Sequence, residues 1–540
     1  MLRPTALPAD VVARLHRDRH WGRVSIGEHF AATCARRGYD DALIEGERRL
    51  SFAEWGRLTE RAALGLLALG VGPGDVVAYQ LPNWWEAAVV FTAAARVGAV
   101  VNPVLPMLRA HELRFILRQS GAAVLVVPGV FRDCDYPQLV AGLRADLPAL
   151  REVLVTRAAP RAAMRSFDAF LDTPWERAPQ TAGRVVSAVD PDSVLMLMYT
   201  SGTTALPKGV LHTHNTLIAE VQSLARVHAL TPRDRTLMPS PLTHISGVIH
   251  AILAPALHGT SAVLMERWDA GQGLDCIERE RVTYMVGAPT FLADLIAQCD
   301  GAGGAAGSSL RLFSCGGAPV TAELIERARA RLGCAAKRVY GSTEFPTIST
   351  TDAADAPRRG SETEGRPIAP AEVRIVDDDG RVCPTDADGE IQARGPECFV
   401  GYADAALNAE AFTADGWFRT GDLGRLDAEG YLRITGRLKD IVIRKGEKFS
   451  VRELEELIAR HPSVADVAVL ALPDPRSGER ACAVVSLRPA AALTLADLTD
   501  FLRRQGLAVQ KLPEQLEVVD ALPRTESGKV HRAALKGRFG

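Results

Sequence analysis

The sequence lacks the cysteine patterns of a protein held together by disulfides or zinc. Its 540 residues include nine cysteines, an odd number, and no two of them form a C-x-x-C pair. Disulfide frameworks use even numbers of cysteines, and structural zinc sites usually need closely spaced ones. Dispersed thiols are typical of a reducing compartment, so we expect a cytoplasmic protein.

The chain also lacks a long hydrophobic run and an excess of charge of either sign. No apolar core of signal-peptide length follows Met1, and the most hydrophobic region, residues 84–108, is interrupted by Glu86, Arg96 and two prolines. Lysine and arginine number 63 against 65 for aspartate and glutamate, so the formal net charge is −2. We therefore expect no membrane span and no nucleic-acid partner.

What the first third does contain is an alternation of strand and helix patterns. Short apolar runs at residues 76–80 and 123–127 alternate with helical patterns at residues 52–69, 85–97 and 111–119. Such alternation predicts mostly parallel sheets that are covered by helices. The length exceeds that of one compact core, so two or more domains are expected.

The pattern changes after about residue 372. Residues 373–376 and 390–393 look like strands of antiparallel hairpins, which predicts a smaller β-subdomain. The last hundred residues look like a separate α+β domain. The predicted fold is therefore a large α/β N-terminal domain, residues 1–437, with stacked, mostly parallel sheets and a β-subdomain, followed by a small C-terminal domain, residues 438–540.

The most informative segment is Tyr-Thr-Ser-Gly-Thr-Thr-Ala-Leu-Pro-Lys-Gly-Val, residues 199–210. It follows an apolar run and combines four serine or threonine hydroxyls with two glycines and a lysine. Such a loop at a strand end can surround a polyphosphate. It is not a Walker A loop, because Pro207 precedes the lysine and Gly209 follows it. A hydroxyl-rich surface loop is the simpler alternative, but the ordered Pro-Lys-Gly ending favours phosphate binding.

Four further segments would each pass for an ordinary turn or a solvated surface if they stood alone. They are Cys315-Gly-Gly-Ala-Pro319, Tyr340-Gly-Ser-Thr-Glu344, Trp417-Phe-Arg-Thr-Gly-Asp-Leu423 and Leu522-Pro-Arg-Thr-Glu-Ser-Gly-Lys529. Together with the loop, and in this order, they resemble the adenylate-forming superfamily, which includes acyl-CoA synthetases, peptide-synthetase adenylation domains and luciferases. Ala205 departs from the pattern, because the family usually has glycine there.

The resemblance implies roles for individual residues in binding ATP. The phosphates would be bound by Thr200, Ser201, Gly202, Thr203, Thr204 and Lys208. Gly316, Gly317 and Ala318 would border the adenine, Tyr340 would stack on it, and Gly341 would also belong to the nucleotide site. Thr343 would contact the α-phosphate, and Glu344, with Thr204, would hold Mg²⁺, a cation that prefers oxygen ligands. Asp422 and Arg437 would bind the ribose.

The resemblance also implies a mobile C-terminal domain that serves two half-reactions. Lys529 would enter the active site to form the acyl-adenylate and stabilise charge in its transition state. The domain would then rotate about Lys439, and Gly446 would line the tunnel of the CoA pantetheine. His244 would gate the carboxylate end of the acid, although a core histidine bonded to the backbone is an equal alternative. The implied cofactors are ATP, Mg²⁺ and CoA.

The segment after His244 indicates the class of acid. Ile245, Val248 and Ile249 are apolar, and Gly247 would leave space beside them. The chain looks most like bacterial short- to medium-chain acyl-CoA synthetases and cyclohexanecarboxylate–CoA ligases, so we expect a hydrophobic medium-chain or alicyclic acid and a place in fatty-acid metabolism. The alternatives are an adenylation enzyme that loads a carrier protein, an aryl acid–AMP ligase and, more remotely, a nonenzymatic nucleotide or acyl sensor. A homodimer is compatible with the resemblance.

Overall fold

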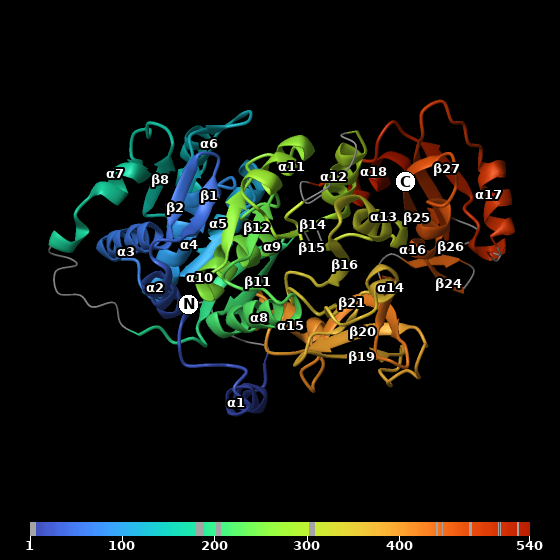
Figure 1. The fold of residues 1–540 in the computed structure, drawn as a ribbon, viewed down its shortest axis with the longest axis horizontal. Coiled ribbons are helices and arrows are strands. Elements are labelled where there is room, and N and C mark those ends of the chain that lie inside the picture. The colour runs from blue at the N-terminus through green and yellow to red at the C-terminus, as the bar shows by residue number, and fades with distance from the viewer. Residues whose placement is uncertain are drawn as a thin grey trace.

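The computed structural model describes residues 7–178, 188–200, 207–301, 308–438, 441–444, 447–474, 478–505, 507, 509–525 and 529–540. Two large sheets and their helices form one side of the molecule, and a small unit that ends at the C-terminus lies at the other side (Figure 1). We refer to residues up to 437 as the N-terminal unit and to residues from 438 as the C-terminal unit. The domain boundary at this position remains a prediction.

The first large sheet has nine strands. In spatial order they are β18 (Arg366–Pro367), β17 (Ser349–Thr350), β16 (Ala335–Tyr340), β15 (Leu312–Gly316), β14 (Tyr284–Gly287), β12 (Arg235–Met238), β13 (Ser261–Leu264), β1 (Asp41–Glu45) and β2 (Arg48–Ser51). Neighbours from β16 to β1 are parallel, and the strands at both ends are antiparallel. The helices α11 (Ala270–Arg279), α12 (Pro289–Gly301) and α13 (Ala322–Leu332) pack against it.

The second large sheet has seven strands. Their order is β11 (Lys208–Thr213), β10 (Val194–Thr200), β4 (Val100–Pro103), β3 (Val76–Tyr79), β5 (Ala122–Pro128), β8 (Glu152–Thr156) and β9 (Arg165–Ser166). All neighbours are parallel except β10 and β11. The prediction of stacked, mostly parallel sheets is therefore confirmed.

The predicted helices of the first third are present between these strands. They are α3 (Phe52–Ala68), α4 (Trp85–Val97) and α5 (Ala110–Ser120), and α2 (Ile26–Arg37) packs beside the first two. The Ser51 hydroxyl accepts the Glu54 backbone N–H at 3.2 Å, which caps α3. Gly98 ends α4 in the left-handed conformation at φ 73°. Because α4 is buried along nearly its whole length, it is the central helix of the largest hydrophobic cluster.

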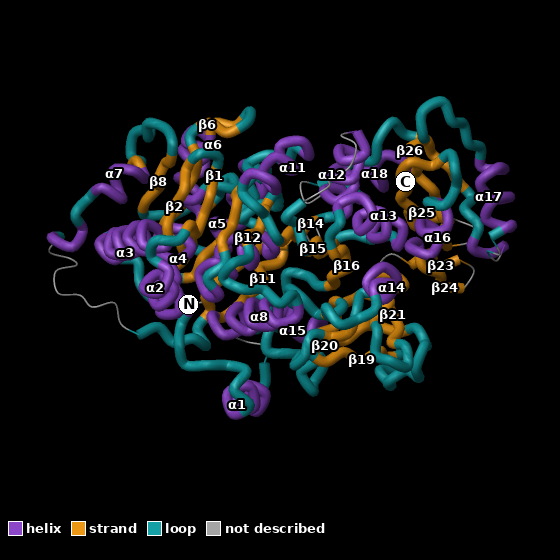
Figure 2. Tube along the Cα trace, in the orientation of Figure 1, coloured by secondary structure: helices purple, strands orange, loops and turns teal. Residues whose placement is uncertain are grey.

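The predicted β-subdomain is a four-stranded antiparallel sheet. Its strands are β19 (Glu372–Val376), β20 (Gly389–Arg394), β21 (Phe418–Leu426) and β22 (Leu432–Arg437), paired in that order. The α8 helix (His214–Val227) follows β11 and lies between this sheet and the large sheets in Figure 2. The last strand, β22, ends where the C-terminal unit begins.

The C-terminal unit is the predicted α+β structure. Its sheet contains β24 (Glu447–Ser450), β23 (Ile441–Arg444), β26 (Gly478–Leu487), β25 (Val464–Asp474) and β27 (Gln515–Val518). The helices α16 (Val451–Ile458) and α17 (Leu495–Arg504) bury Leu454, Ile458 and Leu498 in a core of its own. A further helix, α18 (Arg532–Phe539), buries Leu535 in a second small core of this unit.

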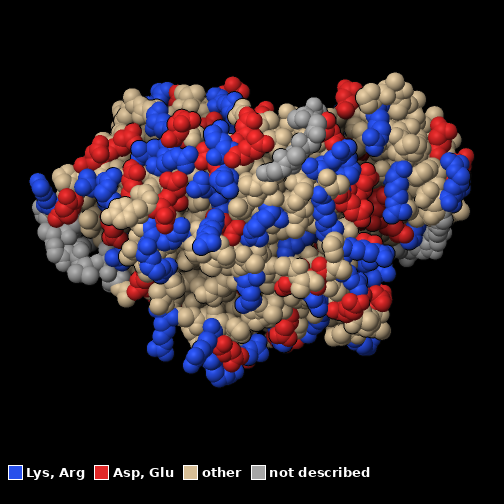
Figure 3. All heavy atoms as spheres, in the orientation of Figure 1, with Lys and Arg blue, Asp and Glu red and all other residues tan. Residues whose placement is uncertain are grey.

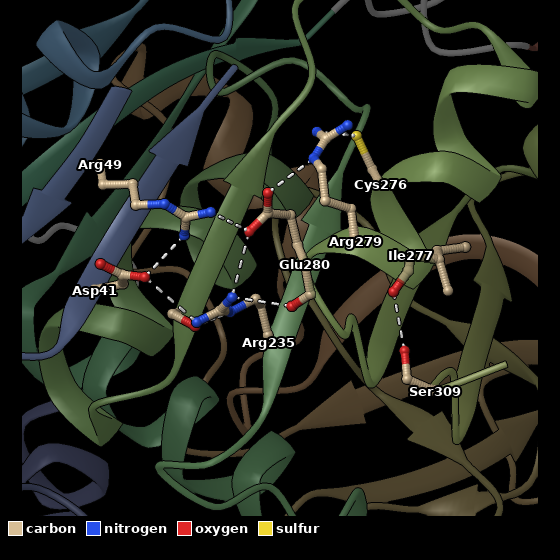
Figure 4. Close-up of polar contacts among 9 residues, drawn as sticks. Asp41, Arg49, Arg235, Cys276, Ile277, Arg279, Glu280 and Ser309 are labelled. Atoms are coloured by element: carbon tan, nitrogen blue, oxygen red, sulfur yellow. Dashed lines mark hydrogen bonds and ion pairs between the residues drawn. The ribbon is translucent and has the colours of Figure 1, made fainter. Parts of the chain in front are cut away.

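A buried carboxylate fixes the β1–β2 edge of the first sheet to its neighbours (Figure 4). Glu280, at the end of α11, accepts hydrogen bonds from Arg49 at 2.8 Å and from Arg279 at 3.0 Å, and Arg235 lies 3.5 Å away. Asp41 pairs with Arg49 at 2.9 Å and with Arg235 at 3.6 Å. All five residues belong to the N-terminal unit, so this network is part of its rigid framework.

The surface agrees with the balanced charge of the sequence. Basic and acidic side chains are interspersed over the face shown in Figure 3. No helix in the described part of the chain is long and apolar enough to cross a membrane.

Candidate active site

The residues predicted to contact the adenine follow two neighbouring strands. Gly316 ends β15 and pairs with Val339 of β16, the residue just before Tyr340. Gly317 and Ala318 continue one loop, and Gly341 begins the other. Since ligands of open α/β sheets bind beyond the carboxyl ends of the strands, this edge of the first sheet is a suitable place for a nucleotide.

Tyr340, Asp422 and Arg437 meet at this edge. The Tyr340 hydroxyl donates to Asp422 Oδ2 at 2.7 Å, and Arg437 Nε pairs with Asp422 Oδ1 at 2.8 Å. Burial raises the pKa of Tyr340 and the charge of Asp422 raises it further, so the phenol stays protonated and donates. Asp422 is buried, whereas the Arg437 side chain is 63% exposed. The structure therefore brings the two predicted ribose ligands and the predicted adenine-stacking tyrosine into direct contact.

Glu344 lies close to the base of the predicted phosphate loop. Thr200 and Lys208 are partners across the β10–β11 hairpin from which this loop extends. The Lys208 ammonium lies 5.2 Å from the centre of the Tyr402 ring, and the Tyr402 hydroxyl donates to Glu344 Oε1 at 2.8 Å. Tyr402 belongs to no motif identified in the sequence. It connects the lysine to the carboxylate, and both belong to the predicted phosphate and metal site.

A buried histidine positions the segment that carries Thr343. His212, in β11, donates from Nε2 to the Thr343 carbonyl at 2.8 Å, and its Nδ1 lies 3.1 Å from the Thr216 hydroxyl. Burial lowers the pKa of His212 to about 4, so the ring is neutral near pH 7 and carries its proton on Nε2. The sequence analysis missed His212. Its one signal is a polar residue directly after the apolar pair Val210-Leu211, in the strand that follows the phosphate loop.

Lys529 is brought from the C-terminal unit to the residues of the N-terminal unit. The side chain is exposed, yet surrounding protein atoms lower the pKa of its ammonium by desolvation, and Arg437 lowers it further. The carboxylates of Asp422 and Glu344 act in the opposite direction. Lys529 therefore lies within electrostatic range of Asp422, a predicted ribose ligand, and of Glu344, a predicted metal ligand.

His244 lies close to the same lysine. Burial lowers the pKa of His244 to about 4, and the positive charge of Lys529 contributes to this shift. The Ser246 hydroxyl lies 3.0 Å from His244 Nδ1, and the Ser246 backbone N–H donates to this nitrogen at 3.4 Å. Since Nδ1 accepts, the neutral ring carries its proton on Nε2 and can donate from there.

The predicted acid-binding wall is buried, and one part of its interpretation is wrong. Ile245 begins the short helix α9 (Ile245–Gly247), and Val248 and Ile249 begin the π-helical turn η3 (Val248–Leu253). All three side chains are buried. A Cβ atom at Gly247 would stand 2.0 Å from the Pro241 carbonyl oxygen, so the polypeptide backbone fills that position. Gly247 permits close packing and adds no space to a pocket.

Six of the predicted site residues lie outside the described part of the chain. They are Ser201, Gly202, Thr203, Thr204, Lys439 and Gly446. The roles given to them remain predictions.

Comparison with known proteins assigns the family. The model of the AMP-binding enzyme family matches residues 30–403, and the model of the AMP-binding enzyme C-terminal domain matches residues 453–529. The chain belongs to the AMP-binding enzyme family. The predicted superfamily is thereby confirmed.

Several AMP-binding enzymes of known activity match almost the whole chain. The medium-chain fatty-acid–CoA ligase of Escherichia coli (strain K12) is 34% identical over 520 residues, which are 96% of this chain and 90% of that protein. The 2-hydroxy-7-methoxy-5-methyl-1-naphthoate–CoA ligase of Streptomyces carzinostaticus is 34% identical and aligns over 99% of this chain and 96% of its own length. A solved anthranilate CoA ligase, AuaEII in complex with anthranoyl-AMP, has a TM-score of 0.85 at 25% identity and aligns over 96% and 97% of the two chains.

Membership in this family confirms the predicted class of reaction. The chain is an ATP-dependent, AMP-forming acid–thiol ligase, whose cofactors are ATP, Mg²⁺ and CoA. The predicted fold, with a large α/β part and a smaller C-terminal part, is also that of solved AMP-binding enzymes.

The residues present fit a Mg²⁺ ion that is held mainly by a nucleotide. Among the described residues, no group of three or more histidine, cysteine, aspartate or glutamate side chains could hold a metal ion. Glu344 offers a single carboxylate, and Tyr402 bonds only one of its oxygens. Magnesium is commonly bound by one or two carboxylates together with substrate phosphates, so one protein carboxylate at this place is sufficient.

Proposed function

We propose that the chain activates a hydrophobic medium-chain or alicyclic carboxylic acid and transfers it to CoA. Two observations support this acid class: Ile245, Val248 and Ile249 are apolar and buried directly after His244, and a matching relative is a medium-chain fatty-acid–CoA ligase. The observation that carries the proposal is the cluster of Tyr340, Asp422 and Arg437 beyond β16, with Lys529 within electrostatic range of it.

In the first half-reaction, an oxygen of the substrate carboxylate would form a bond to the α-phosphorus of ATP, while the bond to pyrophosphate breaks. Lys529 would stabilise the negative charge that develops between the carboxylate and the α-phosphate. Asp422 and Arg437 would hold the ribose, and Tyr340 would fix Asp422 through its hydroxyl. His244 would donate from Nε2 to the acid. Bound Mg²⁺ would neutralise phosphate charge beside Glu344.

In the second half-reaction, the CoA sulfur would form a bond to the acyl carbon, the thiol would lose its proton, and AMP would leave. We propose that residues 1–437 remain in place, whereas residues 438–540 rotate about Lys439 and bring Gly446 to the pantetheine. The main contribution of the protein is positioning and charge stabilisation, since no covalent enzyme intermediate is needed.

A panel of acids tests this proposal. Pyrophosphate release is measured for each acid with and without CoA, together with the formation of the thioester. We expect CoA-dependent turnover, and a kcat/KM for cyclohexanecarboxylate or octanoate well above that for 2,3-dihydroxybenzoate. A buried hydroxyl without a partner costs about 1–3 kcal/mol, which corresponds to roughly a 5- to 150-fold preference. A preference for the dihydroxy acid would contradict the proposed acid class.

One matching relative favours a second acceptor for the acyl group. The salicyl-AMP ligase / salicyl-S-ArCP synthetase of Mycobacterium tuberculosis is 33% identical and aligns over 99% of this chain. Transfer to a purified carrier protein, but not to CoA, would replace CoA as the acceptor and leave the first half-reaction unchanged. Whether the enzyme forms a homodimer is a separate prediction, which analytical ultracentrifugation of the purified chain tests.

A further inference from the structure

A second buried carboxylate, Glu364, joins the two units of the molecule. It follows the helix α14 (Pro357–Glu362) of the N-terminal unit, and its backbone N–H donates to the Leu432 carbonyl. Its Oε2 accepts the Ile434 backbone N–H at 3.0 Å. Its Oε1 lies 3.3 Å from Arg338 Nη1 and 3.3 Å from Arg452 Nη2. Glu364 is thus fixed to the N-terminal unit by three bonds and reaches the C-terminal unit by a fourth.

Arg452 supplies the contact from the other side. It lies in the first turn of α16, next to Ser450, whose hydroxyl accepts the Arg452 backbone N–H at 3.1 Å. Its side chain is only 12% exposed, and its Nε pairs with Glu456 in the same helix at 3.0 Å. Among pairs of described side chains, Glu364–Arg452 is the one ion pair that connects residues up to 438 with residues from 441 onward.

The backbone around this pair is closely packed. The α16 helix and β24 lie against β22, the last strand of the N-terminal unit. A Cβ atom at Gly436, in β22, would lie 2.3 Å from Ser450 Oγ, so the two segments approach each other more closely than a side chain at this position would allow. The pair therefore belongs to an ordered interface and not to a chance contact between solvated surfaces.

The chemistry of the pair permits its separation. If the C-terminal unit moved away, Glu364 would keep Arg338 and the Ile434 N–H, and Arg452 would keep Glu456, whose side chain is half exposed. Neither charge would then be buried without a partner. Breaking a buried ion pair is usually very unfavourable because it leaves such an unpaired charge. A contact of this kind stabilises one arrangement of two units without preventing another.

The same unit that carries Arg452 also carries Lys529. In this arrangement the Lys529 ammonium is within electrostatic range of Glu344 and Asp422. We propose that Glu364 and Arg452 are positioning residues for acyl-adenylate formation: their ion pair holds the C-terminal unit where Lys529 reaches the nucleotide, and it separates before the thioester forms. The proposal rests on the proposed two-step function, in which Lys529 is needed for the first step only.

Two half-reactions of the purified full-length enzyme test the proposal. The first is acid-dependent exchange of pyrophosphate into ATP, and the second is thioester formation from supplied acyl-AMP and CoA. In Glu364→Gln and Arg452→Gln, we expect the exchange rate to fall about tenfold, the effect of losing one hydrogen bond between charged groups. Thioester formation is expected to stay at the wild-type rate or to rise. Arg452→Lys should recover part of the exchange.

Two further variants sharpen the test: one is a matched control and the other probes the separated state. Glu456→Gln removes the partner of Arg452 within its own unit, and Glu362→Gln removes a carboxylate that pairs with Arg358 within the N-terminal unit. Glu362→Gln should leave the ratio of the two half-reactions unchanged, whereas Glu456→Gln should slow thioester formation only, because Arg452 then loses the partner that it keeps after separation. If the rates of both half-reactions fell equally in Glu364→Gln, the role of the pair would be merely structural and the proposal would be overturned. A ratio of the two rates equal to that of the wild type would also overturn it.

Limited digestion with trypsin gives a readout that does not depend on activity. If the pair holds the units together, Glu364→Gln should be cleaved between the two units several-fold faster than the wild type and Glu362→Gln. If no acid supports exchange in the wild type, the proposed function fails, whereas the cleavage rates still decide the role of the pair. Equal cleavage rates in all these proteins would overturn it.

Discussion

Glu280 and Glu364 are both buried glutamates that are surrounded by arginines, but they differ in the origin of those arginines. Arg49, Arg235 and Arg279 around Glu280 all come from the N-terminal unit, and they tie the edge of one sheet to its neighbours. Of the two arginines at Glu364, one comes from each unit. The same chemistry therefore serves a permanent connection in one place and, as we propose, a separable one in the other.

The largest effect is expected from substitution of Lys529, the residue that the Glu364–Arg452 ion pair would hold in position. In Lys529→Ala, pyrophosphate exchange should fall about 100-fold or more, because a preorganised charge at the transition state is lost. Thioester formation from supplied acyl-AMP should be retained. Lys536→Ala, at an exposed lysine of α18, is the control. An equal loss of both half-reactions would remove Lys529 from its role in the first step.

Glu280→Gln tests the other half of the comparison. The variant loses charged hydrogen bonds to Arg49 and Arg279, which are partly exposed and can be rehydrated, so we expect the free energy of unfolding to fall by about 2 kcal/mol. Urea titration measures this change, with Glu278→Gln, at an exposed position of the same helix, as the control. The ratio of the two half-reactions should not change. If it changed as in Glu364→Gln, the distinction between the two glutamates would be wrong.

Tyr340→Phe breaks a hydrogen bond at the active site whose two partners, Tyr340 and Asp422, both belong to the N-terminal unit. It therefore separates an effect on nucleotide binding from an effect on the position of the C-terminal unit. Loss of the hydrogen bond to Asp422 should raise the KM for ATP about fivefold, equivalent to about 1 kcal/mol, in the exchange assay. The control is Tyr431→Phe, which loses a similar bond to Asp355 at 2.6 Å elsewhere in the unit. An unchanged KM would show that the tyrosine does not support the ribose site.

The smallest effect concerns pH. Burial raises the pKa of Glu280, but hydrogen bonds from Arg49 and Arg279 outweigh burial and lower it below 4.5. Because the folded pKa is the lower one, its contribution to stability is complete above pH 4.5 and is lost as the pH falls through the folded pKa. The stability difference between wild type and Glu280→Gln should therefore shrink as the pH falls below 4.5. A difference that grows in acid would contradict this assignment.

The elements that local signals define were predicted well. The helix predicted at residues 85–97 is α4, residue for residue, since the chain supplies an apolar pattern and a glycine at its end. The Ser51 and Ser450 hydroxyls, which cap α3 and α16 by accepting backbone N–H groups, are local signals of the same kind. In contrast, the position of β12 between β13 and β14 depends on pairing between distant segments, which no local pattern specifies.

The candidate site was predicted where motifs are contiguous and missed where contacts are distant. Asp422 was named from its motif and Arg437 from the resemblance to the superfamily, and the structure pairs them. His212 supports Thr343 across 131 positions, and Tyr402 supports Glu344 across 58 positions, so no spacing pattern could identify them. The space assigned to Gly247 was wrong, because the carbonyl of Pro241, which fills it, belongs to a neighbouring turn.

The position of the β21–β22 hairpin determines how far a bound nucleotide would move when the C-terminal unit rotates. Asp422 and Arg437 are direct partners on this hairpin, and the predicted hinge follows Arg437 by two positions. When a body turns, points near the axis move little and remote points move far. The ribose would therefore be bound almost on the axis, and the adenylate could stay still while Lys529, ninety residues further along the chain, travels out of the site.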